Sequence, residues 1–294
     1  MKKIFITGSS GFVGTNLISK FSHYNFIKYK KNDTIEIKQE IVLHLAGKAH
    51  DLRQTTNVSD YYNINTELTK KVYDNFLDSD AKVFITISSV KAVADVLNSI
   101  LNEDYIPNPL THYGKSKLLA EKYILKKNIP IGKRVYILRP CMIHGPGNKG
   151  NLNLLFKIVS KGLPWPLGAF ENKRSFCSID NLCFIINELI ENDKIPSGVY
   201  NIADDEPLST NMIIKLISNS LNKKIKICKI PQFLIKIISN FGDVSKLPLN
   251  TERLNKLTES YIVSNSKIKL AINKSLPLSS KDGMIKTLNS FIHS

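Results

Sequence analysis

The chain has 294 residues, a hydrophobic fraction of 43% and a formal net charge of +16. That fraction is enough for a full core and excludes a disordered chain. The longest apolar runs are too short to span a membrane, and the apolar stretch after Lys3 is too short for the core of a signal peptide. We therefore expect a cytoplasmic protein with no stable membrane insertion.

A strong positive charge can indicate a nucleic-acid or membrane-surface partner. Here the lysines are scattered among Asn and Ile, without an arginine-rich stripe or interleaved aromatic residues. We expect no nucleic-acid partner, and explain the charge by surface lysines or by attraction of a phosphate-bearing small molecule. The stretch PQFLIKIISNF at 231–241 fits an interfacial helix, but we favour an ordinary amphipathic helix packed on the core.

The cysteines show no pattern typical of a metal site or a disulfide framework. They form no CxxC pair, and none has a histidine at zinc-like spacing. We expect reduced, mostly buried thiols and no metal. The four residues are Cys141, Cys177, Cys183 and Cys228.

Short apolar runs alternate with helical periodicity through the first two thirds of the chain. This alternation predicts an α/β fold, a doubly wound parallel sheet with helices on both faces. The predicted strands are Lys3–Thr7, Phe26–Lys30, Ile41–Leu45, Lys82–Ile87, Val135–Leu138 and Gly198–Ala203, and the predicted helices cover 12–22, 60–77, 112–126 and 180–191.

The composition of the sequence changes after Pro140. Glycine- and proline-rich loops follow, and the last ninety or so residues are helical, basic and rich in Asn. We expect a sheet domain built from 1–142 with 176–204. A smaller, mostly helical domain should comprise 143–175 with 205–294.

The first predicted strand runs into TGSSGFVGTNL, where Gly8, Gly11 and Gly14 are spaced three apart. Glycine is needed where a turn is tight, where backbone approaches a pyrophosphate, and where helix meets strand. The amides of Phe12 and Val13 would open a helix and point at the anion. Because the triplet follows a strand and precedes a helix, it predicts a dinucleotide site.

The tip of the second strand indicates which dinucleotide binds. An acid at this tip usually holds the ribose 2′-hydroxyl, but here the residues are Tyr29, Lys30 and Lys31, and Asp33 comes late. Two ammonium groups suit a 2′-phosphate, so NADP is favoured over NAD, and the alternative is that the lysines are solvated loop residues. About ten residues separate this tip from the next strand, which leaves no room for the usual helix.

A second group of residues falls at the end of the strand Lys82–Ile87. Ser88 and Ser89 follow that strand, and Thr111 then caps a helix that carries Tyr113 and Lys117 on one face. A nearby ammonium favours a phenolate, so Lys117 should lower the pKa of Tyr113 and make it a proton shuttle. Ser89 would hydrogen-bond the same substrate oxygen.

Further motifs follow in order: HLAG at 44–47, Asn65 in YYNINTELT, and LRP at 138–140 before HGPG. With the glycine triplet, the Ser88–Ser89 tip and Tyr113-x-x-x-Lys117, the whole chain resembles the extended short-chain dehydrogenase/reductases that act on nucleotide sugars. This resemblance implies a Rossmann domain and a C-terminal substrate-binding domain. It is strongest to the bacterial 4-epimerases and 4-ketoreductases of surface-polysaccharide synthesis.

The resemblance also implies roles for individual residues. Tyr113 would be the acid/base, Lys117 would orient the ribose, and Ser89 would steady the reacting oxygen. Arg174 would face the substrate diphosphate, unless it forms a structural ion pair, and Asn151 and Arg253 are weaker candidates. We expect His44 and His144 to be hydrogen-bonded residues that line the pocket, and not catalysts. The implied cofactor-binding residues are Gly8, Gly11, Phe12, Val13, Gly14, Lys30, Ala46, Gly47, Asn65, Tyr113, Lys117 and Pro140.

The activity itself stays open between two reactions at C4 of the sugar. A 4-epimerase oxidises and re-reduces C4 with a retained cofactor, whereas a 4-keto-6-deoxysugar reductase consumes NADPH. A 4,6-dehydratase is disfavoured, because Val90–Lys91 stand where that group carries Asp-Glu. The alternatives from other classes are a non-catalytic dinucleotide-sensing module and a nucleic-acid binder. A homodimer is left open.

Overall fold

The computed structural model describes residues 1–31, 33–48, 57–148, 151–245 and 250–292. The chain divides into two compact units, of which the first comprises 1–141, 181–203 and 264–277. The second comprises 142–180, 204–263 and 278–294. Segment 264–277 was expected in the smaller domain, but it lies in the first unit. The reason is that Ser264 N donates to Leu101 O at 2.8 Å and Asn265 Nδ2 to Ala203 O at 3.0 Å.

The first unit is built on a parallel sheet of six strands in the order β2-β1-β3-β4-β5-β8. This arrangement confirms the predicted doubly wound α/β fold. Because the order reverses between β1 and β3, the switch point of the sheet lies there, and ligands bind at the carboxyl ends beside such a point. The strands are β1 (Lys3–Thr7), β2 (Asn25–Lys28), β3 (Ile41–His44), β4 (Val83–Ile87), β5 (Arg134–Pro140) and β8 (Gly198–Ile202).

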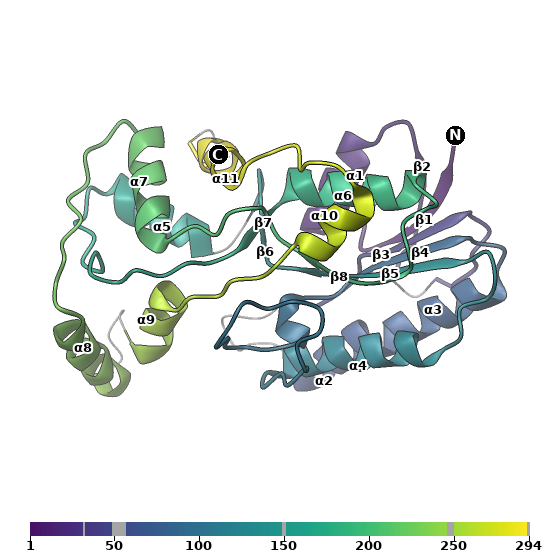
Figure 1. Ribbon diagram of the computed structural model, residues 1–294, viewed down its shortest axis with the longest axis horizontal. Coiled ribbons are helices and arrows are strands. Elements are labelled where there is room, and N and C mark those ends of the chain that lie inside the picture. The colour runs from purple at the N-terminus through teal and green to yellow at the C-terminus, as the bar shows by residue number, and fades with distance from the viewer. Residues whose placement is uncertain (32, 49–56, 149–150, 246–249, 293–294) are drawn as a thin grey trace. The chain divides into compact units, whose positions relative to one another are not determined.

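Helices cover both faces of this sheet (Figure 1). One layer contains α1 (Phe12–Lys20), α6 (Ile179–Glu191) and α10 (Ser266–Ile272), and the other contains α2 (Val58–Tyr62), α3 (Leu68–Asp78) and α4 (His112–Lys126). Val42, Phe84 and Ile137 pack against Tyr73 and Phe76 of α3 in one buried cluster. The described residues between β2 and β3 form no helix, as the short spacing predicted.

The predicted helix at 60–77 contains an irregular turn. A π-helical turn, Asn63–Glu67, joins α2 to α3 and buries Asn65 and Thr66. Such a turn adds a residue to the helical repeat and redirects the side chains within it, and it is frequent at functional sites. A second short element, the 3₁₀ turn Val90–Ala92, begins directly after Ser89.

A buried ion pair connects α4 to β5 within the first unit. Arg139 Nη2 donates to Glu121 Oε2 at 2.6 Å, and Arg139 Nε donates to Glu121 Oε1 at 3.0 Å. The two side chains are only 5% and 2% exposed, and Ser88 Oγ donates to the same carboxylate. The carboxylate of Glu121 therefore ties both β5 and the tip of β4 to the middle of α4.

The second unit has a small parallel pair of strands, β6 (Met142–His144) and β7 (Phe176–Ser178). Segment 176–180 was expected in the sheet domain, but it belongs here because β7 pairs with β6. Trp165, Ile214 and Met284 belong to the buried core of this unit. Its helices are α5 (Asn151–Ser160), α7 (Thr210–Ser220), α8 (Gln232–Ser245), α9 (Thr251–Thr258) and α11 (Ser280–Ser290).

The expectation for 231–241 was wrong in one respect. α8 does form there, but most of its apolar side chains face outward instead of packing on the core. Ile235 is 2% exposed, whereas Phe233 and Phe241 are 62% and 66% exposed. Within the described ranges, no helix combines the length and apolar character needed to cross a bilayer.

Replacing Arg139 with Met should lower the free energy of unfolding by roughly 3–5 kcal/mol, because Glu121 would keep a buried charge without its partner. Urea unfolding followed by circular dichroism measures the loss. Lys38→Ala is the control, since it breaks a pair with Glu36 in which both side chains are more than half exposed. It should cost under about 1 kcal/mol, and equal losses in the two variants would contradict the role of the buried pair.

Candidate active site

The glycine-rich loop after β1 has the geometry of a phosphate cradle. Gly8 adopts φ 70°, and a Cβ there would come within 2.5 Å of Ala46 N. A Cβ at Gly14 would strike the carbonyl oxygen of Gly8. α1 begins at Phe12 with no side-chain cap and no acid in its first turn. Only glycines let the loop approach both its own helix and the end of β3, and the free helix start suits a dinucleotide pyrophosphate.

The loop after β3 meets α4 beside this cradle. A Cβ on Gly47 would lie 2.9 Å from Lys117 Nζ and 3.2 Å from Asn65 Oδ1. The exposed backbone of Gly47 therefore leaves the space that a ribose and nicotinamide require, and a larger residue would fill it. The structure thus brings together Gly47, Asn65 and Lys117, which are far apart in the sequence.

The π-helical turn positions Asn65 between this loop and α4. Its side-chain oxygen accepts from Lys48 N at 2.8 Å, and its amide nitrogen donates to Ser116 Oγ at 3.0 Å. Ser116 in turn donates to the carbonyl of Tyr113 at 2.8 Å. Asn65 is fully buried, so its role in the described structure is to hold the β3 loop against the first turns of α4.

Tyr113 lies in the first turn of α4, where Thr111 caps the helix by accepting from Gly114 N at 3.2 Å. A Cβ on Gly114 would strike Lys91 O, so glycine allows the helix start to approach the turn after Ser89. Tyr113 and Ser89 are joined by a side-chain hydrogen bond, and the ring of Tyr113 meets that of Tyr61 edge-on at 6.3 Å.

The pKa of Tyr113 moves opposite to the sequence prediction. Burial raises it above its usual value and outweighs the hydrogen bond from Ser89, which lowers it. Tyr113 as a whole residue is half-buried. The phenol is therefore protonated at neutral pH, as a proton donor must be.

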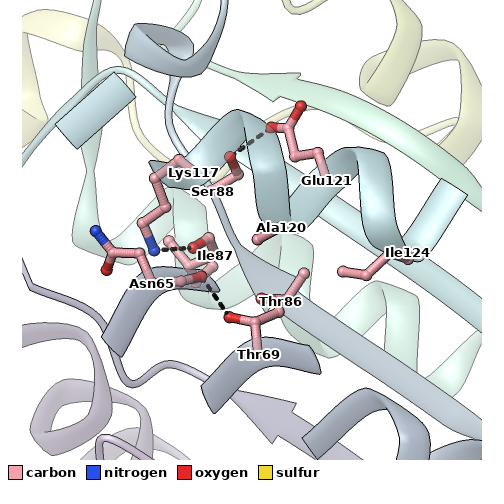
Figure 2. Close-up of a pocket in the computed structure, with 9 residues that line it drawn as sticks. All are labelled: Asn65, Thr69, Thr86, Ile87, Ser88, Lys117, Ala120, Glu121 and Ile124. Atoms are coloured by element: carbon pink, nitrogen blue, oxygen red, sulfur yellow. Dashed lines mark hydrogen bonds between the residues drawn. The ribbon is translucent and has the colours of Figure 1, made fainter. Parts of the chain in front are cut away.

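Lys117 is 7% exposed and lies one helical turn after Tyr113. Its ammonium donates to the carbonyl oxygen of Ile87 at 2.9 Å (Figure 2). Burial lowers the pKa of Lys117 to about 8, and the carboxylate of Glu121 acts in the opposite direction. Figure 2 shows the side chain of Lys117 reaching past the end of β4 towards Asn65.

Two other pairs, Tyr24/Lys28 and Tyr123/Lys127, have the same spacing but different surroundings. Tyr24 donates to Glu191 Oε1 at 2.5 Å and to Asn187 at 2.8 Å. Tyr123 donates to Asp74 at 2.7 Å. Each of these phenols is bonded to a carboxylate, so the spacing acquires chemical meaning only where Ser89 and the strand tips surround it.

The two histidines are buried and hydrogen-bonded. His44 contacts Thr7 Oγ1 and Thr69 Oγ1, each at 2.8 Å, and burial lowers its pKa to about 3. It is therefore neutral and carries no proton for catalysis near neutral pH. His144 lies in the second unit and contacts Thr287 Oγ1 at 2.8 Å.

Two further cofactor candidates lie at the carboxyl ends of strands. Pro140 is the buried last residue of β5. Lys30 and Lys31 are exposed just after β2. Asp33, the acid nearest that tip, accepts from Lys30 N at 3.1 Å and so closes a turn with its carboxylate.

The three substrate candidates in the second unit remain predictions. Arg174 donates to the carbonyl of Lys256 in α9. Arg253 is exposed on α9. Asn151 opens α5, but its side chain lies outside the described structure.

The sequence predictions missed several residues that support the site. Tyr61, Ser116 and Glu121 all contact or orient a predicted catalytic residue. Glu121 follows Lys117 by four positions, a helical spacing that could have suggested a contact. Nothing local indicated Tyr61 or the hydroxyl of Ser116.

Comparison with known proteins agrees with this geometry. The model of the NAD dependent epimerase/dehydratase family matches residues 4–203. A UDP-glucose 4-epimerase from Vibrio cholerae is 29% identical over 320 residues, covering 99% of this chain and 96% of that protein. An N-acetyl-alpha-D-glucosaminyl-diphospho-ditrans,octacis-undecaprenol 4-epimerase from Escherichia coli O157:H7 is 29% identical over 290 residues, covering 90% and 84%.

Among solved structures, RMD from Pseudomonas aeruginosa complexed with NADPH superposes with a TM-score of 0.75. It is 19% identical, and the match covers 100% of both chains. Since the family model spans well over half of the sequence, the protein belongs to the NAD dependent epimerase/dehydratase family and is an enzyme. This confirms the family resemblance inferred from the motifs.

The lowered pKa of Lys117 makes its effect on stability depend on pH. The ordinary lysine value is 10.5 and the folded value about 8, so between these the unfolded chain binds more protons and stability rises with pH. In cofactor-free protein, the free energy of unfolding of Lys117→Met minus that of the wild type should fall by roughly 3 kcal/mol from pH 7 to pH 11. Denaturant titrations at several pH values measure this difference.

Lys122→Met is the matched control, because Lys122 is exposed on the same helix. Its difference from the wild type should stay nearly constant over the same range. A constant difference for Lys117→Met as well would show that the Lys117 ammonium is not desolvated.

Proposed function

We propose that the protein transfers hydride at C4 of a nucleoside-diphosphate sugar, as a 4-epimerase or a 4-keto-6-deoxysugar reductase of surface-polysaccharide precursor synthesis. The observation that carries the proposal is the convergence of Ser89, Tyr113 and Lys117 beside the glycine cradle, all within the first unit. A UDP-hexose or UDP-N-acetylhexosamine is the proposed substrate type. The V. cholerae relative, a UDP-glucose 4-epimerase by name, supports it.

The cradle fits a nicotinamide dinucleotide, which when bound would accept or donate the hydride. Gly8, Gly11 and Gly14, with the amides that open α1, would hold its pyrophosphate. The ammonium of Lys117, already fixed by Ile87 O, would orient a ribose hydroxyl next to Gly47. Ala46, Asn65 and Pro140 would complete the walls of the nicotinamide side.

Tyr113 would transfer the proton, and Ser89 would hydrogen-bond the oxygen that receives or loses it. In the reductive direction, the Tyr113 hydroxyl donates its proton to the oxygen on C4, and in the oxidative direction the phenolate takes it back. Ser89 hydrogen-bonds Tyr113 and accepts from Lys91 N at 3.2 Å. Its hydroxyl would therefore bind the same substrate oxygen. The raised pKa keeps Tyr113 protonated at rest, which suits a reduction and also the reductive half of an epimerisation.

Dehydration finds no support at the corresponding positions. Val90 is buried, and Lys91 Nζ donates to the carbonyl of Asp95 at 2.7 Å. Neither residue supplies a carboxylate to remove the C5 proton or to protonate a leaving hydroxyl. The absence of an acid–base pair there favours reactions confined to C4.

There is a second candidate for the group that is linked to the substrate sugar through the diphosphate. The E. coli relative is, by its name, a 4-epimerase of a sugar linked through a diphosphate to undecaprenol. Both relatives are named as 4-epimerases, and both named substrates carry the sugar on a diphosphate. A polyprenyl-diphosphate sugar is therefore the alternative substrate class.

Tyr113→Phe should lower turnover by about 10²–10⁴-fold, because the proton donor is lost. Dinucleotide binding should stay intact, because the ring remains. Activity is measured with UDP-hexoses, UDP-N-acetylhexosamines and their 4-keto-6-deoxy derivatives. Stoichiometric loss of NADPH identifies a reductase, and interconversion without net loss identifies an epimerase. Binding is measured by cofactor fluorescence.

The matched control is Tyr123→Phe, which removes a hydroxyl with the same lysine spacing on the same helix. It should leave turnover within about twofold, since Tyr123 donates to Asp74 outside the site. Full activity in Tyr113→Phe would remove the proposed mechanism.

Lys30→Asp should shift cofactor preference from NADPH towards NADH by roughly tenfold or more, because a charge-assisted contact to the 2′-phosphate would become a repulsion. The ratio of the dissociation constants for the two cofactors measures the shift. Lys71→Asp makes the same charge change at an exposed site on α3 and should leave the ratio unchanged. An unchanged ratio in Lys30→Asp would mean that Lys30 is only a solvated loop residue.

A further inference from the structure

Helix α8 has three distinct faces. Ile235, Ser239 and Gly242 are buried and form a narrow seam against the second unit. Asn240 and Asp243 form a polar face bonded to Thr251, which donates from its backbone to Asp243 Oδ1 at 3.0 Å and from its hydroxyl to Asn240 Oδ1 at 3.1 Å. α9 thus occupies the polar side of α8, and the two helices lie next to each other (Figure 1).

The third face of α8 is apolar and exposed. Phe233, Ile237 and Phe241 follow one another at intervals of four residues and are 62%, 61% and 66% exposed. Leu234 and Ile238 lie beside them at the same interval and are 41% and 47% exposed. Side chains at this spacing share one face of a helix, so five large apolar groups form a continuous stripe. A stripe of this kind on a folded chain indicates an interaction surface.

The charge of the segment that leads into α8 and forms its first turns has one sign. From Glu206 to Asp243 the chain contains six lysines and no other charged residue. Lys224, Lys229 and Lys236 are all exposed, and the first two lie in the segment that leads into α8. That segment is fixed to the core of the unit, because Trp165 N donates to Lys226 O at 2.9 Å and Cys228 N donates to Trp165 O at 2.8 Å. The lysines of this segment therefore have a fixed position in the second unit, next to the start of α8.

We propose that α8 docks on the surface of an anionic lipid bilayer, with its apolar stripe among the acyl-chain ends and its lysines on the headgroups. Helices with an apolar face and a lysine-bearing polar side bind membrane interfaces in this way, and each basic residue near the surface adds to the attraction. With 14 residues, α8 is too short to span the bilayer and lies in its plane.

Charge complementarity favours this occupant over a second copy of the chain. Two copies joined through α8 would bring two lysine-rich segments together without an acid between Glu206 and Asp243 to neutralise them. A bilayer rich in phosphatidylglycerol supplies both the apolar interior and the negative charge. The inference is independent of the proposed reaction, since it concerns where the enzyme binds and not what it transforms.

The first test is co-sedimentation of the full chain with phosphatidylcholine vesicles that do or do not contain phosphatidylglycerol. The wild type should bind the anionic vesicles, and the triple variant Phe233→Ser/Ile237→Ser/Phe241→Ser should bind them at least about tenfold more weakly. The control Ile106→Ser/Ile131→Ser/Leu270→Ser removes three apolar side chains that are each more than four-fifths exposed elsewhere. It should bind like the wild type.

The contribution of the lysines to membrane binding is tested with the triple variant Lys224→Gln/Lys229→Gln/Lys236→Gln. This variant should also bind anionic vesicles more weakly, and wild-type binding should decrease with added salt, because salt screens exposed charges. Circular dichroism verifies that each variant is folded, which the exposure of all the substituted side chains leads us to expect.

A second measurement uses tryptophan fluorescence to detect contact between α8 and lipid. It uses a variant that is expected to bind the vesicles, and not one that has lost binding. Trp165 is the single tryptophan and is 3% exposed, so lipids cannot reach it. Phe233→Trp adds an exposed reporter to the stripe. Anionic vesicles should shift its emission to the blue, and brominated lipids should quench it, while the wild type shows neither change.

Three results would overturn the proposal. The first is that wild type does not bind anionic vesicles, and the second is equal binding by the serine variant of α8 and the wild type. The third is a concentration-dependent dimer in analytical ultracentrifugation that the serine variant abolishes, with no quenching of Phe233→Trp by brominated lipids. That result would assign the stripe to a second copy of the chain. None of these measurements depends on enzymatic turnover.

Discussion

The candidate site depends on a lysine ammonium held away from water. Lys117 is buried on α4, and its pKa is lowered to about 8 because burial disfavours the charge. A buried ammonium needs hydrogen-bond partners, and it finds the carbonyl of Ile87 at the end of β4. This contact sets the distance between helix and strand, and Tyr113, one turn earlier on the same helix, is thereby placed next to Ser89.

The surrounding contacts make that placement rigid. Asn65 joins the loop after β3 to Ser116, and the carboxylate of Glu121 joins Arg139 of β5 to the tip of β4. The tips of three neighbouring strands are thus fixed against one helix by buried polar groups. Such groups are costly unless every partner is present, so the same contacts that stabilise the first unit also hold the candidate catalytic residues in place.

The second unit shows a different use of apolar surface. Its core is formed around Trp165 and α7, while α8 contributes only a narrow buried seam and turns five large apolar side chains outward. Among the described residues, these five side chains therefore stay between 41% and 66% exposed after this unit has folded. Together with the surrounding lysines, that surface suits an anionic bilayer better than a further layer of protein.

Local patterns in the sequence determined the order of strands and helices, the glycine cradle, the Thr111 cap and the helix that carries Tyr113 and Lys117. Each is encoded within a few neighbouring residues, by period, turn chemistry or capping. Tertiary structure alone decided the Glu121–Arg139 pair, the upward shift in the pKa of Tyr113, the outward face of α8 and the return of 264–277 to the first unit. These features depend on burial and on contacts between distant segments, which the periodicity of a single segment does not contain.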